Sequence, residues 1–146
     1  MLALGFDFGR RRIGVAVGSD LGGKARPIAD VDCRDGQPDW TRLEAIVAEW
    51  KPECLVVGLP YNMDGSESEM SRAARRFAGR LQARCRTRVQ FVDERLSSRE
   101  AAHRLRSARD SGERKRRTRA ADVDREAAAV ILQSWLDHPD QRGAEE

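Results

Sequence analysis

The segment from Leu55 to Leu59 is apolar throughout, and it constrains the fold more than any other part of the chain. Such a run is typical of a strand that is buried on both faces of a parallel sheet. The residues before it have the apolar spacing of a helix, which we expect to begin at Asp39 and to end before Pro52. A helix that leads into a buried parallel strand predicts an α/β fold.

Two apolar segments near the N-terminus, Leu2–Phe8 and Ile13–Val17, flank three consecutive arginines, and we expect them to form a β-hairpin. The other predicted elements are, in chain order, a strand at 27–33, a helix from near Ser66 or Ser68, a strand at 89–92, a helix from Ser97 and a last helix at about 122–136. The order is therefore βββαβαβ followed by helices. It predicts a mixed five-stranded sheet with helices on both faces.

The length of 146 residues fits one domain, which we expect to occupy residues 1–138 with a frayed polar tail at 139–146. No stretch approaches the roughly 18 apolar residues that a membrane span needs, and the N-terminus becomes acidic too early for a signal peptide. We therefore expect a cytoplasmic protein. The three cysteines, Cys33, Cys54 and Cys85, form no CxxC motif, which indicates buried, reduced thiols rather than disulfides or a zinc site.

Basic residues are clustered in two segments of a chain whose net charge is only +3. Residues 72–88 hold seven arginines and no acid, and residues 103–119 hold eight Lys or Arg with two acids. Such clusters are expected of a protein that binds a phosphate backbone. A solvated helix face and a polar loop would give the same pattern, so the clusters alone do not decide the function.

Asp7 is unusual because it lies between Phe6 and Phe8 in a strand that otherwise has the composition of a core strand. A buried carboxylate is costly unless it has a partner or a metal ion. Asp7 is therefore either a ligand or a strand-end residue that accepts hydrogen bonds from a turn.

Asp93 and Glu94 close the last predicted strand. Ligands bind in α/β sheets at the carboxyl ends of parallel strands, so these two acids are candidates for a site with Asp7. Because side chains alternate along a strand, Asp93 and Glu94 point to opposite faces, and at most one of them readily joins Asp7. In the alternative, both are loop carboxylates that pair with Arg95 or Arg99.

Asp122 and Asp124 begin the last predicted helix, where any acid is favoured by the helix dipole. Asp124 shares a helical face with the apolar Ala128 and Ile131, so it heads the stripe that is expected to pack on the sheet. Asp122 lies about 200° away around the helix and is better placed as an N-cap. Asp124 is therefore the better candidate ligand.

Three carboxylates, at two strand ends and one helix start, could converge on a divalent metal ion. Oxygen-only ligands suit Mg²⁺ or Mn²⁺ rather than zinc. Two such ions about 4 Å apart can hydrolyse a phosphodiester, because one activates water and the other stabilises the leaving oxygen. No motif for nucleophilic catalysis competes, since the only histidines are His103 and His138, which we expect at the surface.

The motifs around these acids occur in a fixed order from about Leu2 to Trp135. They are Gly5-Phe6-Asp7-Phe8-Gly9, Ile13–Gly18, Ala25-Arg26-Pro27, Val56–Pro60, Asn62–Gly65, Asp93–Ser97, and Val123-Asp124 with Ala127-Ala128. Together they resemble the YqgF (RuvX) family, whose members are described as Holliday junction resolvases or pre-16S rRNA nucleases.

The resemblance implies an RNase H-like fold and an acidic triad of Asp7, Glu94 and Asp124 in a bacterial cytoplasmic protein. It also implies that residues 58–65 and 95–97 line the site, and it links the chain to maturation of the 5′ end of 16S rRNA. The sequence departs from the family at Asp122, where a basic or neutral residue is more usual. The choice of Asp124 over Asp122 as the ligand therefore depends on the helical phase.

The predicted function is a metal-dependent nuclease acting on structured nucleic acid, either pre-rRNA or branched DNA, with the ribosome as a candidate partner. The protein would be a monomer or a homodimer, since a resolvase needs two sites related by two-fold symmetry. Tyr61 is the one loop aromatic, which favours recognition of backbone shape, and residues 109–119 are a candidate arm that the substrate orders. The residues predicted to contact nucleic acid are Arg10, Arg11, Arg12, Asn62, Arg72, Arg76, Arg95, Ser97, Arg114, Lys115, Arg116, Arg117 and Arg119.

Two other classes of function stay open. Asp7-Phe8-Gly9 before a hairpin also resembles the first phosphate loop of actin-like ATPases and sugar kinases, but those proteins bind nucleotide between two such domains and this chain holds one. A non-catalytic RNA-binding or ribosome-assembly factor would use the basic segments alone, and its binding would depend steeply on salt. It would have no use for three convergent carboxylates.

Overall fold

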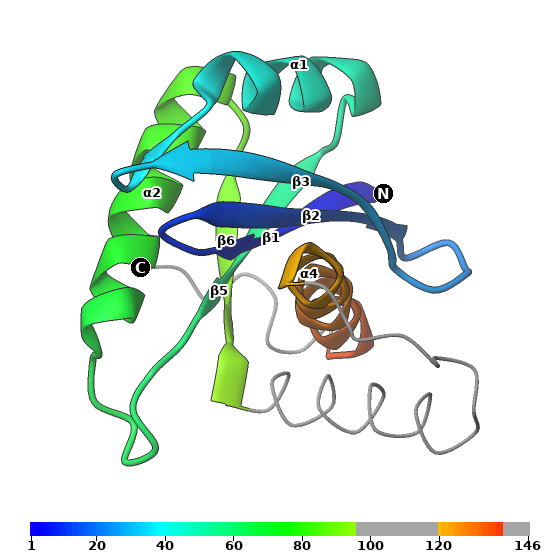
Figure 1. Cartoon of the computed structure of the whole chain (residues 1–146). Helices are drawn as coiled ribbons and strands as arrows, with labels where there is room; N and C mark the ends of the chain where they lie inside the picture. Colours follow the sequence, from blue (N-terminus) through cyan, green and yellow to red (C-terminus); the bar gives the residue numbers. More distant parts are fainter. Residues whose placement is uncertain (96–119, 139–146) are drawn as a thin grey trace, which may run out of the picture.

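The computed structural model describes residues 1–95 and 120–138, except for the side chains of 120–125. Within these residues lies a mixed sheet of six strands in the order β4-β3-β2-β1-β5-β6 (Figure 1). β1, β5 and β6 are parallel, whereas the β1–β2, β2–β3 and β3–β4 pairs are antiparallel. The predicted helix from Ser97 lies outside the described residues. The strands are β1 (Leu2–Phe8), β2 (Arg12–Ser19), β3 (Arg26–Arg34), β4 (Gln37–Pro38), β5 (Cys54–Leu59) and β6 (Val89–Asp93).

The prediction of five strands is wrong by one, because the short strand β4 folds back on β3. The turn between them is Asp35-Gly36, and these residues have positive φ angles of 53° and 75°. Asp-Gly is favoured in such hairpin turns. The turn is visible in the sequence, but β4 has only two residues and therefore no periodicity. The predicted hairpin of β1 and β2 is confirmed, with Phe8 opposite Ile13.

Helices cover both faces of the sheet, as predicted. α1 (Trp40–Trp50) and α2 (Glu69–Cys85) lie on one face, and α4 (Ala120–Asp137) lies on the other (Figure 1). The predicted helix starts are confirmed, because Asp39 caps α1 and Ser68 caps α2 in a capping box with Ser71. None of the helices in this part of the chain is long and apolar enough to cross a membrane.

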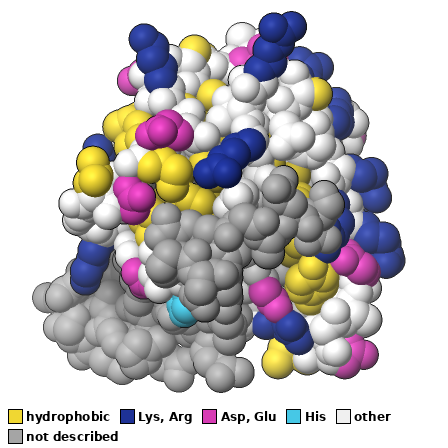
Figure 2. All heavy atoms as spheres, turned by 180° about the vertical axis from the view of Figure 1, so that it is seen from behind, with side chains coloured by type: hydrophobic (Ala, Val, Ile, Leu, Met, Phe, Trp, Pro, Cys, Tyr) yellow, Lys and Arg dark blue, Asp and Glu magenta, His cyan; other side chains and the backbone are white. Residues whose placement is uncertain are grey.

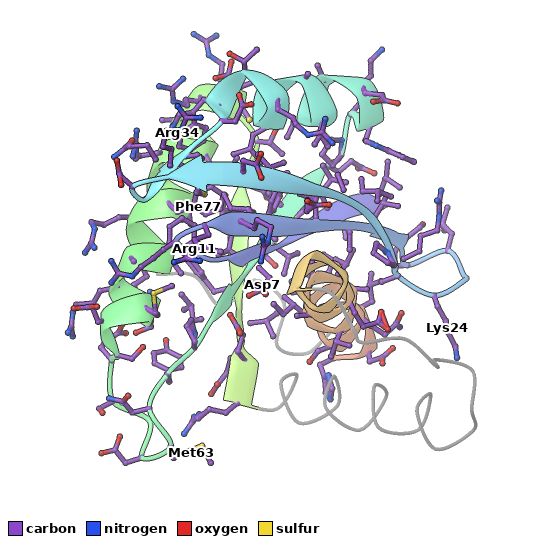
Figure 3. All side chains as sticks on the ribbon, viewed as in Figure 1. Asp7, Arg11, Lys24, Arg34, Met63 and Phe77 are labelled. Atoms are coloured by element: carbon purple, nitrogen blue, oxygen red, sulfur yellow. The ribbon has the colours of Figure 1, made fainter. Side chains whose placement is uncertain are left out.

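Alternation along β1 divides its side chains between two hydrophobic layers. Leu4 and Phe6 pack toward α1 and α2, whereas Gly5 faces α4. A Cβ at Gly5 would lie 2.7 Å from Leu132 Cβ, so the close approach of α4 requires glycine there. Asp7 is two residues beyond Gly5 and therefore lies on the α4 side of the sheet (Figure 3).

The cysteines are free thiols, as predicted, but only Cys54 is fully buried. Cys33 and Cys85 are half-buried, so the prediction of buried thiols is wrong for these two. Cys33 lies near the end of β3, where only the short β4 covers the sheet edge, and Cys85 is the last residue of α2. Burial and the nearby charge of Asp32 still raise the pKa of Cys33 to about 11.

Replacing Trp135 by Phe should lower the free energy of unfolding by about 1–3 kcal/mol. Trp135 Nε1 donates a hydrogen bond of 2.9 Å to Gln90 Oε1, and both side chains are only 3% exposed. The substitution removes this donor from a buried carbonyl oxygen. Urea denaturation measures the change, and Trp50→Phe is the matched control because Trp50 is only half-buried. Equal losses in the two variants would contradict a role for the bond.

Candidate active site

Two of the predicted acids lie where the parallel strands end. β5 lies between β1 and β6, with Gly58 opposite Val92 of β6. Because Phe6 pairs with the residue before Gly58, Asp7 falls level with Gly58. Glu94 is two residues beyond Val92, and alternation puts it on the same face, against α4. Asp7 and Glu94 therefore share one face and one edge of the sheet, with a single strand between them.

Gly58 provides the space into which the Glu94 side chain extends. A Cβ at Gly58 would lie 2.7 Å from both Cγ and Oε2 of Glu94, and 2.7 Å from Cδ1 of Ile131. The Glu94 carboxylate therefore lies over β5, on the path from β6 to the strand that carries Asp7. Neighbouring strands are about 4.8 Å apart, so this position brings Glu94 close to Asp7. The sequence alone does not reveal this role of Gly58, and its only signal there is a glycine near the end of a strand of bulky residues.

The surroundings of Glu94 disfavour its ionised form. Burial, and then the negative charge of Asp93, raise the pKa of Glu94 to about 7. A divalent cation would act in the opposite direction, because it stabilises an adjacent carboxylate. Carboxylate oxygens are the ligands that Mg²⁺ and Mn²⁺ prefer. The acids that the structure brings together therefore fit such an ion.

α4 brings its N-terminal end to the same edge of the sheet. Ala128 O would lie 3.1 Å from a Cβ at Gly5, near the middle of β1. Near the other end of α4, Leu136 Cδ1 would lie 3.0 Å from a Cβ at Gly18, which pairs with Ala3 at the start of β1. The helix therefore runs from the carboxyl end of β1 toward its amino end. Asp124 lies one turn before Ala128, at the carboxyl end.

The buried stripe predicted for the last helix is confirmed, since Ala128, Ile131 and Trp135 are at most 3% exposed. The helix begins at Ala120, slightly before the predicted start. The structure does not describe the side chains of Asp122 and Asp124, so the assignment of Asp124 as the third metal ligand stays a prediction. Among the side chains that are described, no group of three or more His, Cys, Asp or Glu is placed to hold a metal ion.

Asp93 points to the other face and pairs with Arg95, as expected of a loop carboxylate. Arg95 Nε donates to Oδ1 and Oδ2 of Asp93 at 3.1 and 3.0 Å. Burial alone would raise the pKa of Asp93, but the hydrogen bonds from Arg95 outweigh it and lower this pKa. Arg95 Nη1 also donates to Met63 O at 3.3 Å. Arg95 thus links the end of β6 to the loop at 60–67.

The loop at 60–67 is held by its own polar side chains. Asn62 Nδ2 donates to Ser66 Oγ at 3.0 Å and to Glu67 O at 3.2 Å. Asn62, which was predicted to contact nucleic acid, therefore uses its amide nitrogen within the loop. Met63 is 78% exposed and lies at the far tip of this loop (Figure 3). The loop presents a preformed surface beside the acids.

The basic side chains are concentrated on the side of the molecule where α2 lies. In Figure 2, which views the molecule from behind, Lys and Arg gather along the right margin, the α2 side. Among the predicted contact residues, Arg10 pairs with Glu69, and Arg12 is half-buried in β2. The exposed ones are Arg10, Arg11, Asn62, Arg72 and Arg76. Those outside the described residues are Ser97, Arg114, Lys115, Arg116, Arg117 and Arg119.

Comparisons with known proteins are consistent with this arrangement. The model of the RuvX family, described as Holliday junction resolvase, matches residues 1–138. A protein of Chromohalobacter salexigens named "Putative pre-16S rRNA nuclease" is 52% identical over 135 residues, covering 92% of this chain and 88% of that protein. A protein of the same name from Azotobacter vinelandii is 48% identical over 136 residues, covering 92% of each chain.

A solved structure gives the fold. The structure of RuvC from Thermus thermophilus superposes with a TM-score of 0.59 at 16% sequence identity, covering 95% of this chain and 97% of that chain. This likeness confirms the predicted RNase H-like fold.

Proposed function

The chain belongs to the RuvX family, and on that premise we propose that Asp7, Glu94 and Asp124 form the active site of a metal-dependent nuclease. The family is one of nucleases, so the chain is a hydrolase that acts on phosphodiester bonds. The observation that carries the site is the extension of Glu94 across Gly58 toward the strand of Asp7. The direction of α4 supports Asp124 as the third ligand, because Asp124 lies one helical turn before Ala128, which packs on Gly5.

These three acids would hold Mg²⁺ or Mn²⁺. When bound, the metal supplies activation of the attacking water and stabilisation of the leaving oxygen. The protein's own side chains bind and orient the substrate. The exposed arginines on the α2 side contact phosphates without reading sequence, and the loop at 60–67 limits how the backbone approaches the acids.

We further propose that the substrate is the precursor of 16S rRNA. Two relatives that are 52% and 48% identical carry that substrate in their names. Tyr61 is half-buried and its hydroxyl accepts a hydrogen bond from Arg75, so it is poorly placed to stack on a base. Recognition would therefore follow the shape of the RNA backbone. With this substrate, one nuclease domain over residues 1–138 would act in the cytoplasm on the assembling ribosome.

Holliday junction resolution is the second candidate, because the family description names it. A resolvase cuts two strands symmetrically and needs two active sites related by a two-fold axis. This function would therefore require a homodimer, whereas trimming one RNA end needs a single active site.

Cleavage of two substrates distinguishes these functions. The full chain is incubated with a precursor fragment that carries the 5′ end of 16S rRNA and with a four-way DNA junction, each in Mg²⁺, Mn²⁺ or EDTA. We expect metal-dependent cleavage of the RNA at a rate at least about tenfold above that of the junction. Faster cleavage of the junction would favour the resolvase. Binding without cleavage in every metal would favour a non-catalytic assembly factor.

A further inference from the structure

A pocket of about 230 Å³ lies at the end of β1, on the face of the sheet opposite α4. Three parts of the fold line it: the end of β1 with the turn that follows, the β3–β4 hairpin and the outer side of α2. Phe77, labelled in Figure 3, belongs to the α2 wall. The residues that define its chemistry are Phe8, Arg10, Gln37, Arg76, Phe77 and Arg80.

The base of this pocket is aromatic. Phe8 and Phe77 are stacked, with ring centroids 5.0 Å apart and an interplanar angle of 27°. Phe77 is only 3% exposed, whereas Phe8 is half-buried, so Phe8 offers the accessible ring surface. The volume of about 230 Å³ is below the roughly 300–1,000 Å³ of pockets for drug-sized ligands, so the pocket suits a single planar base.

The rim of the pocket is basic. Three guanidinium groups line it, and no carboxylate of the described residues does. Arg10 already pairs with Glu69, and Arg80 donates to Gln37 Oε1 at 3.2 Å. Arg76 makes no hydrogen bond, ion pair or ring contact with the part of the chain that the structure describes. Arg76 is therefore the group available to an incoming anion.

We propose that this pocket binds one unstacked nucleotide of the substrate strand, with its base against Phe8 and its phosphate on Arg76. Unstacked bases are bound on aromatic side chains, and phosphates on guanidinium groups. Phe8 directly follows Asp7 along β1, and the two side chains point to opposite faces. A strand held at the acids therefore reaches the pocket by passing around the end of β1. The nature of the substrate follows from the proposed function, but binding at the pocket needs no metal.

The first test measures binding without cleavage. The affinity of the full chain for a labelled single-stranded RNA is measured in EDTA by fluorescence anisotropy. Arg76→Gln should weaken binding about tenfold, because it removes a charged contact to phosphate. Arg42→Gln is the matched control, since Arg42 is an exposed arginine on α1 that lies outside the pocket and is not among the predicted contact residues. It should change affinity less than about threefold. Equal effects of the two variants would overturn the proposal.

The second test identifies the ligand. The protein is titrated in EDTA with adenosine 5′-monophosphate or with inorganic phosphate, and the backbone amide signals of Phe8, Gln37 and Phe77 are followed by NMR. The nucleotide should shift these signals with saturation in the wild type and not in Arg76→Gln. Equal shifts with phosphate alone would overturn the assignment of a base. The two proposals can fail separately. Nucleotide binding at the pocket without metal-dependent cleavage would contradict only the proposed nuclease activity. Normal cleavage, together with equal RNA affinities of the two arginine variants, would contradict only the proposed nucleotide pocket.

Discussion

Replacing Asp7 by Asn should reduce metal-dependent cleavage at least about 100-fold and leave the protein folded. Asn preserves the shape of the side chain but removes the negative charge that a divalent ion requires. Asp7 shares its face of the sheet with Glu94, so neutralising it also removes repulsion between two acids. The free energy of unfolding in EDTA should therefore stay equal or rise. Single-turnover cleavage and urea denaturation measure the two effects.

Asp32→Asn is the matched control, because Asp32 is an exposed carboxylate on β3, away from the candidate site. Mg²⁺ should raise the melting temperature of the wild type and of this control, but not of Asp7→Asn. Glu94→Gln should reproduce the loss of cleavage. The double variant should lose little more than either single variant, since ligands of one site act as a unit. Undiminished cleavage by Asp7→Asn would remove Asp7 from the active site.

The residues alone predict that one of two adjacent acids joins Asp7, but not which one. Alternation along β6 shows only that Asp93 and Glu94 diverge. The register of β6 decides between them, because Gln90 bonds to Trp135 of α4 and Glu94 has the same parity as Gln90. That register depends on packing between distant segments, and only the family resemblance anticipates its result.

Elements with repeated apolar spacing are predicted well, because several apolar residues at the same spacing all indicate the same helix or strand. The stripe of α4 and the caps at Asp39 and Ser68 are examples. The features that were missed are short or involve residues far apart in sequence. β4 has two residues, and the link from Arg95 to Met63 joins positions 32 residues apart. Local patterns contain no information about such contacts.

Replacing Gly58 by Ala should impair cleavage while the protein stays folded. The added Cβ would lie 2.7 Å from Cγ and Oε2 of Glu94 and 2.7 Å from Cδ1 of Ile131. Both side chains can rotate away, so β5 should stay in the sheet and the free energy of unfolding should fall by about 1–3 kcal/mol. Glu94 would then leave its position over β5. Because a displacement of about 1 Å can cost 100-fold in rate, cleavage should fall about 100-fold.

Two other glycines provide controls. Apart from the neighbouring backbone of its own helix, no described atom lies within 4 Å of a Cβ added at Gly79 in α2. Gly79→Ala should therefore raise the free energy of unfolding by roughly 0.5–1 kcal/mol with normal cleavage. At Gly18 the added Cβ would lie 3.0 Å from Leu136 Cδ1, at the end of α4 away from the acids. Gly18→Ala should therefore lower the free energy of unfolding without moving Glu94.

Cleavage is compared at a temperature where all variants are folded. If cleavage follows stability across the three variants, Gly58 does not position Glu94. If only Gly58→Ala loses cleavage, the space above β5 belongs to the active site, and the glycine is there because a longer side chain would displace the acid.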